Sequence, residues 1–373
     1  MSVYIAGKAW VTPLGSGIPE VWNRLLSGEQ PELQEVRDPL GEKAYPAYRV
    51  PASALKNLPA HPRLRRASAI SRFAAAAGLA ALNDANVRPD QAPDQRLALI
   101  FAVANGGVIY TRRFYHDIVK TGADAASPLL FPETVFNAAA SHLAAIIGLT
   151  GTTYTVVGDG AVGLTALTMA EDLLSDPQLD HCLIVAAEEA DWLLGDAYRK
   201  WRLLRSESPI EVYGRAKGTI LSEGAGALVV SRTGRVRIAT AVGGGHFRRR
   251  TDAWAVLART LQQVGAPADA TVISSANGTF IDKAEIAAVR KTIPNATLYS
   301  PKVSLGDGVA ASSVWQMIVA AEALCSGEMP LPQYVASPET NPAGRMNIPG
   351  DEISVLCCGM NQQTGAARLS IDS

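Results

Sequence analysis

Short apolar segments alternate with longer segments of helical periodicity along most of this chain, and this alternation limits the folds open to it. The strand candidates are Leu97–Val103, Thr153–Val157, His181–Ala187, Gly226–Ser231, Thr271–Ser275 and Glu352–Cys358. The helix candidates are Ser68–Asn83, Leu164–Leu174, Asp252–Val264 and Ser312–Leu324, with Asp252 as a candidate N-terminal cap. Strands that alternate with helices favour an α/β protein built in layers, with largely parallel strand pairing.

The composition agrees with sheets that are covered by helices on both faces. Hydrophobic residues make up 48% of the 373 residues and charged residues 18%. The formal net charge of −1 gives no overall field that would attract nucleic acid or an acidic membrane surface. Two local basic clusters, Arg63 with Arg65 and Arg66, and Arg248–Arg250, are either solvated faces or a docking patch for an acidic protein partner.

The cysteines and the N-terminus indicate a cytoplasmic protein. Cys182, Cys325, Cys357 and Cys358 form no Cys-x-x-Cys pair, and no histidine is spaced to complete a zinc site. The opening MSVYIAGKAWVTPLG has no basic stretch followed by an apolar core, as a signal peptide would have. No apolar run approaches the length of a membrane span, so we expect neither a membrane segment nor a metal site.

An internal echo suggests two related halves. Gly158-Asp159-Gly160 follows an apolar strand candidate and opens a helix candidate, and Gly306-Asp307-Gly308 does the same. In both places a methionine follows the first glycine at the same spacing, Met169 and Met317. The glycine-rich segment Thr233–Arg250 is the candidate seam. We therefore predict an N-terminal half over 1–235 and a C-terminal half over 236–373.

Several motifs resemble those of β-ketoacyl synthases. The opening IAGKAWVTPLGSGIPEVWNRLLSGE, from Ile5, is similar to the start of that family. Further matches follow in the family's order. Ser127–Ala140 resembles its S-P-x-x-x-P…N-x-A segment, Ser222–Ala227 its G-E-G-A-G, and Ser300–Gly306 its S-x-K-x-x-x-G-H. The resemblance covers essentially the whole chain. It implies the thiolase fold, in which two related α/β halves stack as five αβαβα layers and dimerise through the nucleophile strand.

The resemblance also implies where catalytic residues would lie in an active member. A cysteine at a strand-to-helix turn takes the acyl chain from a carrier protein, because the helix N-terminus favours its thiolate. Two histidines stabilise the enolate that forms when the malonyl carrier loses carbon dioxide. A lysine hydrogen-bonds within the site, and a C-terminal F-G-F-G-G loop moves beside the cysteine.

At these places the sequence has a different set of residues. The cysteine position is Gly160, and the two histidine positions are Asn277 and Asp307. The C-terminal loop reads Gly359-Met360-Asn361-Gln362-Gln363. Lys302 and Glu223 are retained, and we interpret them as members of a structural hydrogen-bond network.

The substituted residues cannot perform the family's chemistry. Gly160 has no nucleophile, and we expect it to relieve a strained turn, because glycine lacks a Cβ. Asn277 cannot carry the positive charge of an imidazolium. Asp307 would repel an enolate by about 4 kcal/mol at about 4 Å and an effective dielectric of about 20. A new acid–base site of Asp159, Asp307 and Lys302 is disfavoured, because turn aspartates usually bond their own backbone.

A degenerate chain with the whole fold retained most resembles a chain-length factor. Such a subunit pairs with an active ketosynthase and shapes the tunnel for the growing chain in type II polyketide, aryl-polyene or fatty-acid-like biosynthesis. It needs no cofactor of its own and works with a phosphopantetheinylated acyl carrier protein. Chain-length factors often carry Gln at the cysteine position, so Gly160 is a departure. By position, the tunnel residues would be Tyr110, Phe114, Tyr115, Phe131 and Phe136, although aromatic residues at such spacing can equally be core or dimer contacts.

Two alternatives to a chain-length factor remain open. One is a thiolase-fold enzyme without a cysteine, such as a decarboxylase or a carrier-bound acyl hydrolase. The other is a purely structural subunit of a larger acyl-carrier assembly.

Overall fold

Two sets of five strands with the same order form the centre of the structure, a computed structural model that describes residues 2–88, 96–335, 346–347 and 350–371. The first set has the order β1-β9-β7-β5-β6, with β1 (Val3–Thr12), β5 (Leu97–Val103), β6 (Thr153–Val157), β7 (His181–Glu188) and β9 (Gly224–Ser231). The second has the order β10-β17-β16-β11-β12, with β10 (Val236–His246), β11 (Thr271–Ile273), β12 (Thr297–Tyr299), β16 (Glu352–Cys358) and β17 (Gln363–Ile371). β1 pairs antiparallel with β10 and joins the two sets, and β14 (Tyr334–Val335) extends the far end.

The pairing directions repeat between the two sets and correct the expectation of largely parallel strands. β5 pairs in parallel with β6 and β7, as β11 does with β12 and β16. β9 pairs antiparallel with β1 and β7, as β17 does with β10 and β16. Connection length explains the mixture. Residues 359–362 alone join β16 to β17 and allow only a hairpin, whereas α8 (Phe280–Thr292) lies between β11 and β12 and allows a parallel return.

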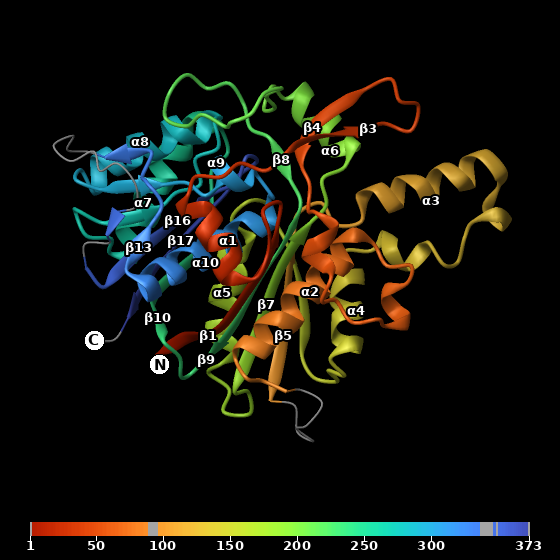
Figure 1. Cartoon of the computed structure of the whole chain (residues 1–373), viewed down its shortest axis with the longest axis horizontal. Coiled ribbons are helices and arrows are strands. Elements are labelled where there is room, and N and C mark those ends of the chain that lie inside the picture. The colour runs from red at the N-terminus through yellow and green to blue at the C-terminus, as the bar shows by residue number, and fades with distance from the viewer. Residues whose placement is uncertain (1, 89–95, 336–345, 348–349, 372–373) are drawn as a thin grey trace.

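Helices cover and separate the two strand sets in five layers (Figure 1). α2 (Ala69–Asp84) and α4 (Ala138–Ile146) pack on the outer face of the first set, and α7 (Ala253–Val264) packs with α8 on the outer face of the second. α5 (Val162–Leu173) and α10 (Ala310–Ser326) lie between the sets and contact strands of both. Residues 310–321 are buried without exception. This αβαβα stack is the layering that the resemblance implied.

The internal echo corresponds to equivalent helices of the two halves. α5 begins at Val162, four residues after Gly158, and α10 begins at Ala310, four residues after Gly306. The two helices contact each other in the central layer. Two related halves are therefore present in the topology, while the division at residue 235 stays a prediction.

Most of the expected elements form within a few residues of their predicted bounds. Ser68 caps α2 by accepting a hydrogen bond from the Ser71 backbone N–H. Asp252 occupies the N-cap position of α7, but its side chain does not cap the helix. It accepts a hydrogen bond from the Thr251 hydroxyl instead, so this detail of the prediction is wrong.

The remaining elements surround this stack. They are α1 (Ile18–Leu26), α3 (Val108–Thr121), α6 (Trp192–Lys200), α9 (Lys302–Leu305), β2 (Gly15–Ser16), β3 (Leu33–Arg37), β4 (Ala44–Tyr48), β8 (Leu221–Ser222), β13 (Glu328–Met329), β15 (Met346–Asn347) and short 3-10 turns at Ala52–Leu55, Pro62–Leu64, Ala123–Ala125, Phe131–Thr134 and Arg250–Asp252. α3 reaches away from the body and has no buried residue (Figure 1). Within the described residues, none of the helices combines the length and apolar character that crossing a bilayer requires.

Candidate functional site

The turn between β6 and α5 places Gly160 against the C-terminal loop. Gly160 is buried, and a Cβ at this position would lie 3.0 Å from the Gly359 Cα and 3.4 Å from the Cys358 carbonyl oxygen. Its backbone is not in the left-handed region, so the expectation that glycine relieves strain here is wrong. Glycine instead provides space, because it allows two backbone segments to approach closely.

Asp159 joins the same turn to the C-terminal loop. Its Oδ2 accepts hydrogen bonds from the backbone N–H groups of Asn361 (3.1 Å), Gln362 (2.8 Å) and Gln363 (3.3 Å). In return, the Asp159 backbone N–H donates to Gln363 Oε1 at 2.7 Å. Burial raises the pKa of Asp159, and the backbone hydrogen bonds oppose that rise. The aspartate therefore bonds mainly to the backbone of a distant segment.

Asn277 follows β11 and is completely buried. Its Nδ2 donates to Asp307 Oδ2 at 2.6 Å. Its Oδ1 accepts from the Thr279 hydroxyl at 2.6 Å and from the Thr279 backbone N–H at 3.2 Å. Both ends of the Asn277 side-chain amide are therefore engaged in hydrogen bonds with Asp307 and Thr279.

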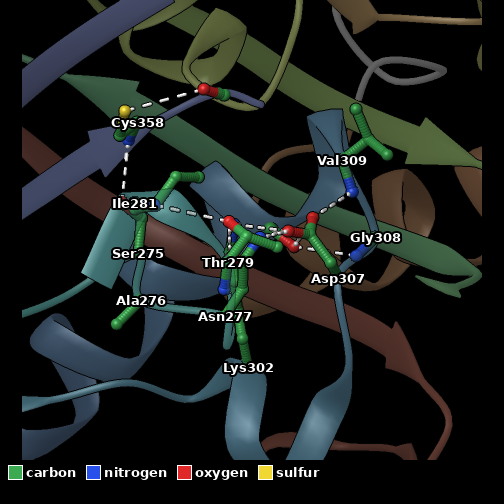
Figure 2. A network of polar contacts seen from close by, with 12 residues as sticks. Ser275, Ala276, Asn277, Thr279, Ile281, Lys302, Asp307, Gly308, Val309 and Cys358 are labelled. Carbon is green, nitrogen blue, oxygen red and sulfur yellow. Dashed lines mark hydrogen bonds and ion pairs between the residues drawn. The ribbon is translucent and has the colours of Figure 1, made fainter. Parts of the chain in front are cut away.

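Asp307 forms a buried ion pair with Lys302, and both side chains are 2% exposed. Lys302 Nζ lies 3.0 Å from Asp307 Oδ2, while Oδ1 accepts from the Val309 backbone N–H at 2.9 Å. Figure 2 shows these groups and Asn277 converging on the carboxylate. Burial lowers the pKa of Lys302, but the charge and hydrogen bond of Asp307 outweigh it, so the pKa is raised.

This ion pair weakens the repulsion between Asp307 and an enolate that was expected from the sequence. The negative charge of Asp307 is already balanced by Lys302, so it does not stand alone at the site. The expected repulsion of an enolate is therefore smaller than the value for an isolated charge. The cation and the amide donor of the site, Lys302 and Asn277, are both already bonded to Asp307.

Glu285 on α8 supports the loop that carries Asn277. It accepts hydrogen bonds from the Ser274 hydroxyl, from the Ser275 hydroxyl at 2.5 Å and from the Ser275 backbone N–H at 3.0 Å. The Ser275 hydroxyl oxygen in turn accepts from the Cys358 backbone N–H at 2.8 Å. Burial raises the pKa of Glu285 to about 7. The network links the end of β11 to the end of β16.

Glu223 lies in a separate network before β9. Its Oε1 is 3.2 Å from Arg49 Nε and accepts from the Val50 backbone N–H at 3.2 Å, and its Oε2 accepts from the Ala190 backbone N–H at 3.4 Å. These contacts connect three chain segments. They fit the interpretation of Glu223 as a structural residue.

The site residues offer no activated nucleophile. Burial raises the pKa values of the Cys357 and Cys358 thiols well above their ordinary value, which keeps them protonated. In the part of the chain that the structure describes, no hydrogen bond joins Asp159 to Asp307 or Lys302. The three groups are bound in two separate arrangements and do not form one acid–base site.

The five aromatic candidates for a tunnel lie on the surface around α3. Tyr110, Phe114 and Tyr115 belong to α3, and the rings of Phe114 and Phe131 pack with centroids 5.6 Å apart. Tyr115 is 67% exposed, Phe131 55% and Phe136 47%, whereas Tyr110 and Phe114 are half-buried. The three exposed residues are therefore not core contacts of this chain. Their assignment to a tunnel stays a prediction.

A basic groove of about 570 Å³ opens beside the loop that contains Asn277. Its charged lining residues are Arg199, Arg202, Lys217, Arg250 and Lys283, and Thr279 also contributes to its wall. Arg250 belongs to one of the basic clusters noted in the sequence. Arg65, from the other cluster, lines a separate hollow of about 610 Å³.

The sequence alone predicted candidate positions of the site but not their partners. Ser274 and Ser275 after β11 and Ser312 in α10 take part in the polar networks, and a serine in such a place carries no signal that would single it out. The hydrogen bonds between Asp159 and the C-terminal loop could not be predicted from the sequence either. Its partners are backbone N–H groups, which every residue except proline possesses.

Comparisons with known proteins agree with this architecture. The family model described as "Beta-ketoacyl synthase, N-terminal domain" matches residues 1–235. Nodulation protein E of Rhizobium leguminosarum bv. trifolii is 22% identical over 238 residues, which cover 61% of this chain and 57% of that protein. The match thus spans little more than half of that relative's length.

Solved structures resemble the chain over its full length. A β-ketoacyl synthase from Burkholderia phymatum STM815 has a TM-score of 0.85 at 16% identity, with 100% of both chains covered. The ishigamide ketosynthase/chain length factor gives the same score and identity, covering 100% of this chain and 99% of that one. A type II polyketide synthase acyl-carrier protein in complex with its ketosynthase gives 0.82 at 18% identity, with 100% and 99% covered.

Proposed function

This chain belongs to the β-ketoacyl synthase family and has its thiolase fold, and from this premise we propose that it is a non-catalytic chain-length-factor subunit. In this role it pairs with an active ketosynthase and shapes the tunnel that holds the growing acyl chain. The reaction belongs to the partner. The chain uses no cofactor and acts on chains that a phosphopantetheinylated acyl carrier protein delivers.

One observation carries the proposal: none of the three positions where the resemblance expects a catalytic residue holds a side chain that is free to act. Gly160 has no side chain, Asn277 is bonded to Thr279 and Asp307, and Asp307 is paired with Lys302. Condensation needs a thiolate and donors aimed at developing negative charge. The buried polar groups of Asn277, Asp307 and Lys302 bond to one another, so they stabilise the fold and do not serve condensation.

The surface around β6 supports a partner subunit. β6 is the last strand in its set, and Tyr154 and Val157 on it are 42% and 49% exposed. With the exposed Phe131 and Phe136 nearby in the sequence, these residues expose apolar groups that a partner would cover. Val157→Lys should abolish association with the ketosynthase while the isolated chain stays folded. Light scattering of the co-expressed pair tests this, with Leu40→Lys, at a 78% exposed site, as the control.

The basic groove supports a carrier protein as the second partner. Its five cations are unaccompanied by a lining carboxylate, and carrier proteins and their phosphopantetheine groups are anionic. Arg202→Glu should weaken carrier binding to the heterodimer, with a steeper loss at low salt. Binding that ignores this charge reversal would remove the groove from the proposal.

The decisive experiment follows acyl groups by intact-mass spectrometry. The purified heterodimer is incubated with acyl carrier protein loaded with a labelled acyl group, and the mass of each subunit is measured. We expect label on the ketosynthase and none on this chain. As a control, a ketosynthase whose nucleophilic cysteine is replaced by alanine should abolish all labelling.

Other outcomes would support the alternatives. Label on this chain, or turnover of malonyl carrier by the isolated chain, would indicate an enzyme of the thiolase fold that needs no cysteine. Product lengths that ignore every substitution at the five aromatic positions would indicate a purely structural subunit.

A further inference from the structure

We infer that Asp159 is a latch that holds residues 359–363 against the turn at Gly160 and closes this turn to acyl chains. The consequence for synthesis rests on the proposed function, since a closed turn leaves every acyl chain to the partner. The latch itself is a property of this chain and can be tested on it alone.

One carboxylate oxygen of Asp159 accepts three hydrogen bonds from the C-terminal loop. Three successive backbone N–H groups, from Asn361 to Gln363, donate to Asp159 Oδ2 at 2.8 to 3.3 Å. Successive N–H groups that converge in this way form a concave site for an anion. Here the anion belongs to the protein, on a turn about 200 residues earlier in the sequence.

The loop and the turn approach so closely that neither could carry a side chain at its glycine. A Cβ on Gly359 would lie 1.9 Å from Asp159 Oδ1, which no side chain could tolerate. A Cβ on Gly158 would lie 2.4 Å from Gln363 Oε1. Glycine on both segments thus allows the loop to lie directly on the turn.

The loop lies between the turn and the solvent. Gly160, Gly359 and Met360 are buried, whereas Asn361 and Gln362 are exposed. The loop is therefore the outer cover of the turn, and its exposed residues carry two of the N–H groups that the latch holds. Without the carboxylate, these N–H groups would turn to water at little cost.

Hydrogen exchange tests the latch directly. In the isolated full chain, Asp159→Ala should speed exchange of the Asn361–Gln363 amides by about tenfold or more, because they lose a shared charged acceptor. Asp159→Asn, which keeps an oxygen acceptor without the charge, should give an intermediate rate. Asp172→Asn, at an exposed carboxylate on α5, is the control and should leave the rates unchanged. Unchanged loop exchange in Asp159→Ala would overturn the latch.

Thiol accessibility tests the closure of the turn. A thiol introduced by Gly160→Cys should react with iodoacetamide slowly, and about tenfold faster when Asp159→Ala is added. Peptide mapping distinguishes it from the four natural cysteines. Should the double variant fail to fold, Asp159→Asn, which removes the charge of the shared acceptor, replaces Asp159→Ala. Equal rates with and without the second substitution would contradict the inference.

The two proposals fail in different ways. Loop exchange that ignores Asp159 would remove the latch and leave the chain-length-factor role untouched. Acyl label on this chain in the heterodimer would remove that role, even with a loop that Asp159 holds.

Discussion

Asp307 determines the state of Lys302, because a buried ammonium group is costly unless a partner balances its charge. Asp307 supplies the counter-charge at 3.0 Å, and Asn277 and the Val309 N–H also donate hydrogen bonds to its carboxylate. These side chains are therefore part of the folded core.

Removing one partner of this pair should be strongly destabilising. Lys302→Met leaves Asp307 with an unbalanced buried charge, and we expect a loss of about 3–5 kcal/mol in the free energy of unfolding. The double variant Lys302→Met/Asp307→Asn should lose less than the single one. Urea denaturation measures both. Lys43→Met, which breaks an exposed pair with Asp196, is the control and should cost under about 1 kcal/mol.

Glu285 should make stability depend on pH. Its pKa is raised from 4.5 to about 7, so the folded chain binds the proton more tightly than the unfolded chain. Its contribution to stability is present below about pH 4.5 and is lost as the pH rises through about 7. Glu285→Gln should remove on the order of 3 kcal/mol of this decline. Denaturation at pH 5 and pH 8 gives the comparison, and an equal decline in both proteins would contradict the assignment.

At the scale of elements, periodicity predicted what side-chain patterns can encode. β5, β6 and β16 have the bounds expected from the sequence, because each is a short apolar run ended by glycine or polar residues. β1, β10 and β17 were missed. β10 and β17 mix small and polar residues, such as Gly243–Gly245 in β10, which carry little strand signal. β1 does contain β-branched and aromatic residues, and its segment was matched only to a family motif. Strand direction was mispredicted because it depends on connections rather than on composition.

The site shows the same division between what the sequence encodes and what it does not. The positions Gly160, Asn277 and Asp307 were predicted from motif order alone. Their pairing could not be, because Asn277 and Asp307 are thirty residues apart and meet only when β11 and the turn before α10 are in place.

Substitutions in α3 and in the 3-10 turn Phe131–Thr134 should affect product length more than stability. Phe131 is 55% exposed, and Phe114 packs on it from a helix without buried residues. Phe131→Ala and Phe114→Ala should therefore cost the isolated chain under about 1 kcal/mol. In the heterodimer they should lengthen the product, because a smaller side chain admits further two-carbon units. Chromatography and mass spectrometry of the products check this, and unchanged lengths would remove the tunnel assignment.

At the scale of the whole molecule, the two related halves share one core. A single cluster of buried residues includes Ile100 and Leu164 from the first half and Trp315 and Ile353 from the second. α10 is enclosed by strands of both sets. Another cluster of buried residues lies wholly within the first half. The halves are thus related by topology, and they share the cluster of the central layer.

Neither half should fold by itself. A fragment of residues 1–235 leaves α5 without α10 and without the second strand set, and it exposes the apolar face that they cover. We expect this fragment to lack cooperative thermal unfolding by circular dichroism, whereas the full chain unfolds in a single transition. Co-expression of 1–235 with 236–373 should restore the transition. Cooperative unfolding of 1–235 alone would show that the shared core is dispensable.

The Lys302–Asp307 pair also bears on which substitutions the chain can accept at these two positions. A neutral side chain in place of Asp307 would leave the ammonium group of Lys302 buried without its counter-charge. A change at either position alone therefore costs stability, whereas a joint change to neutral side chains costs less. We expect the two positions to vary together among relatives rather than one at a time.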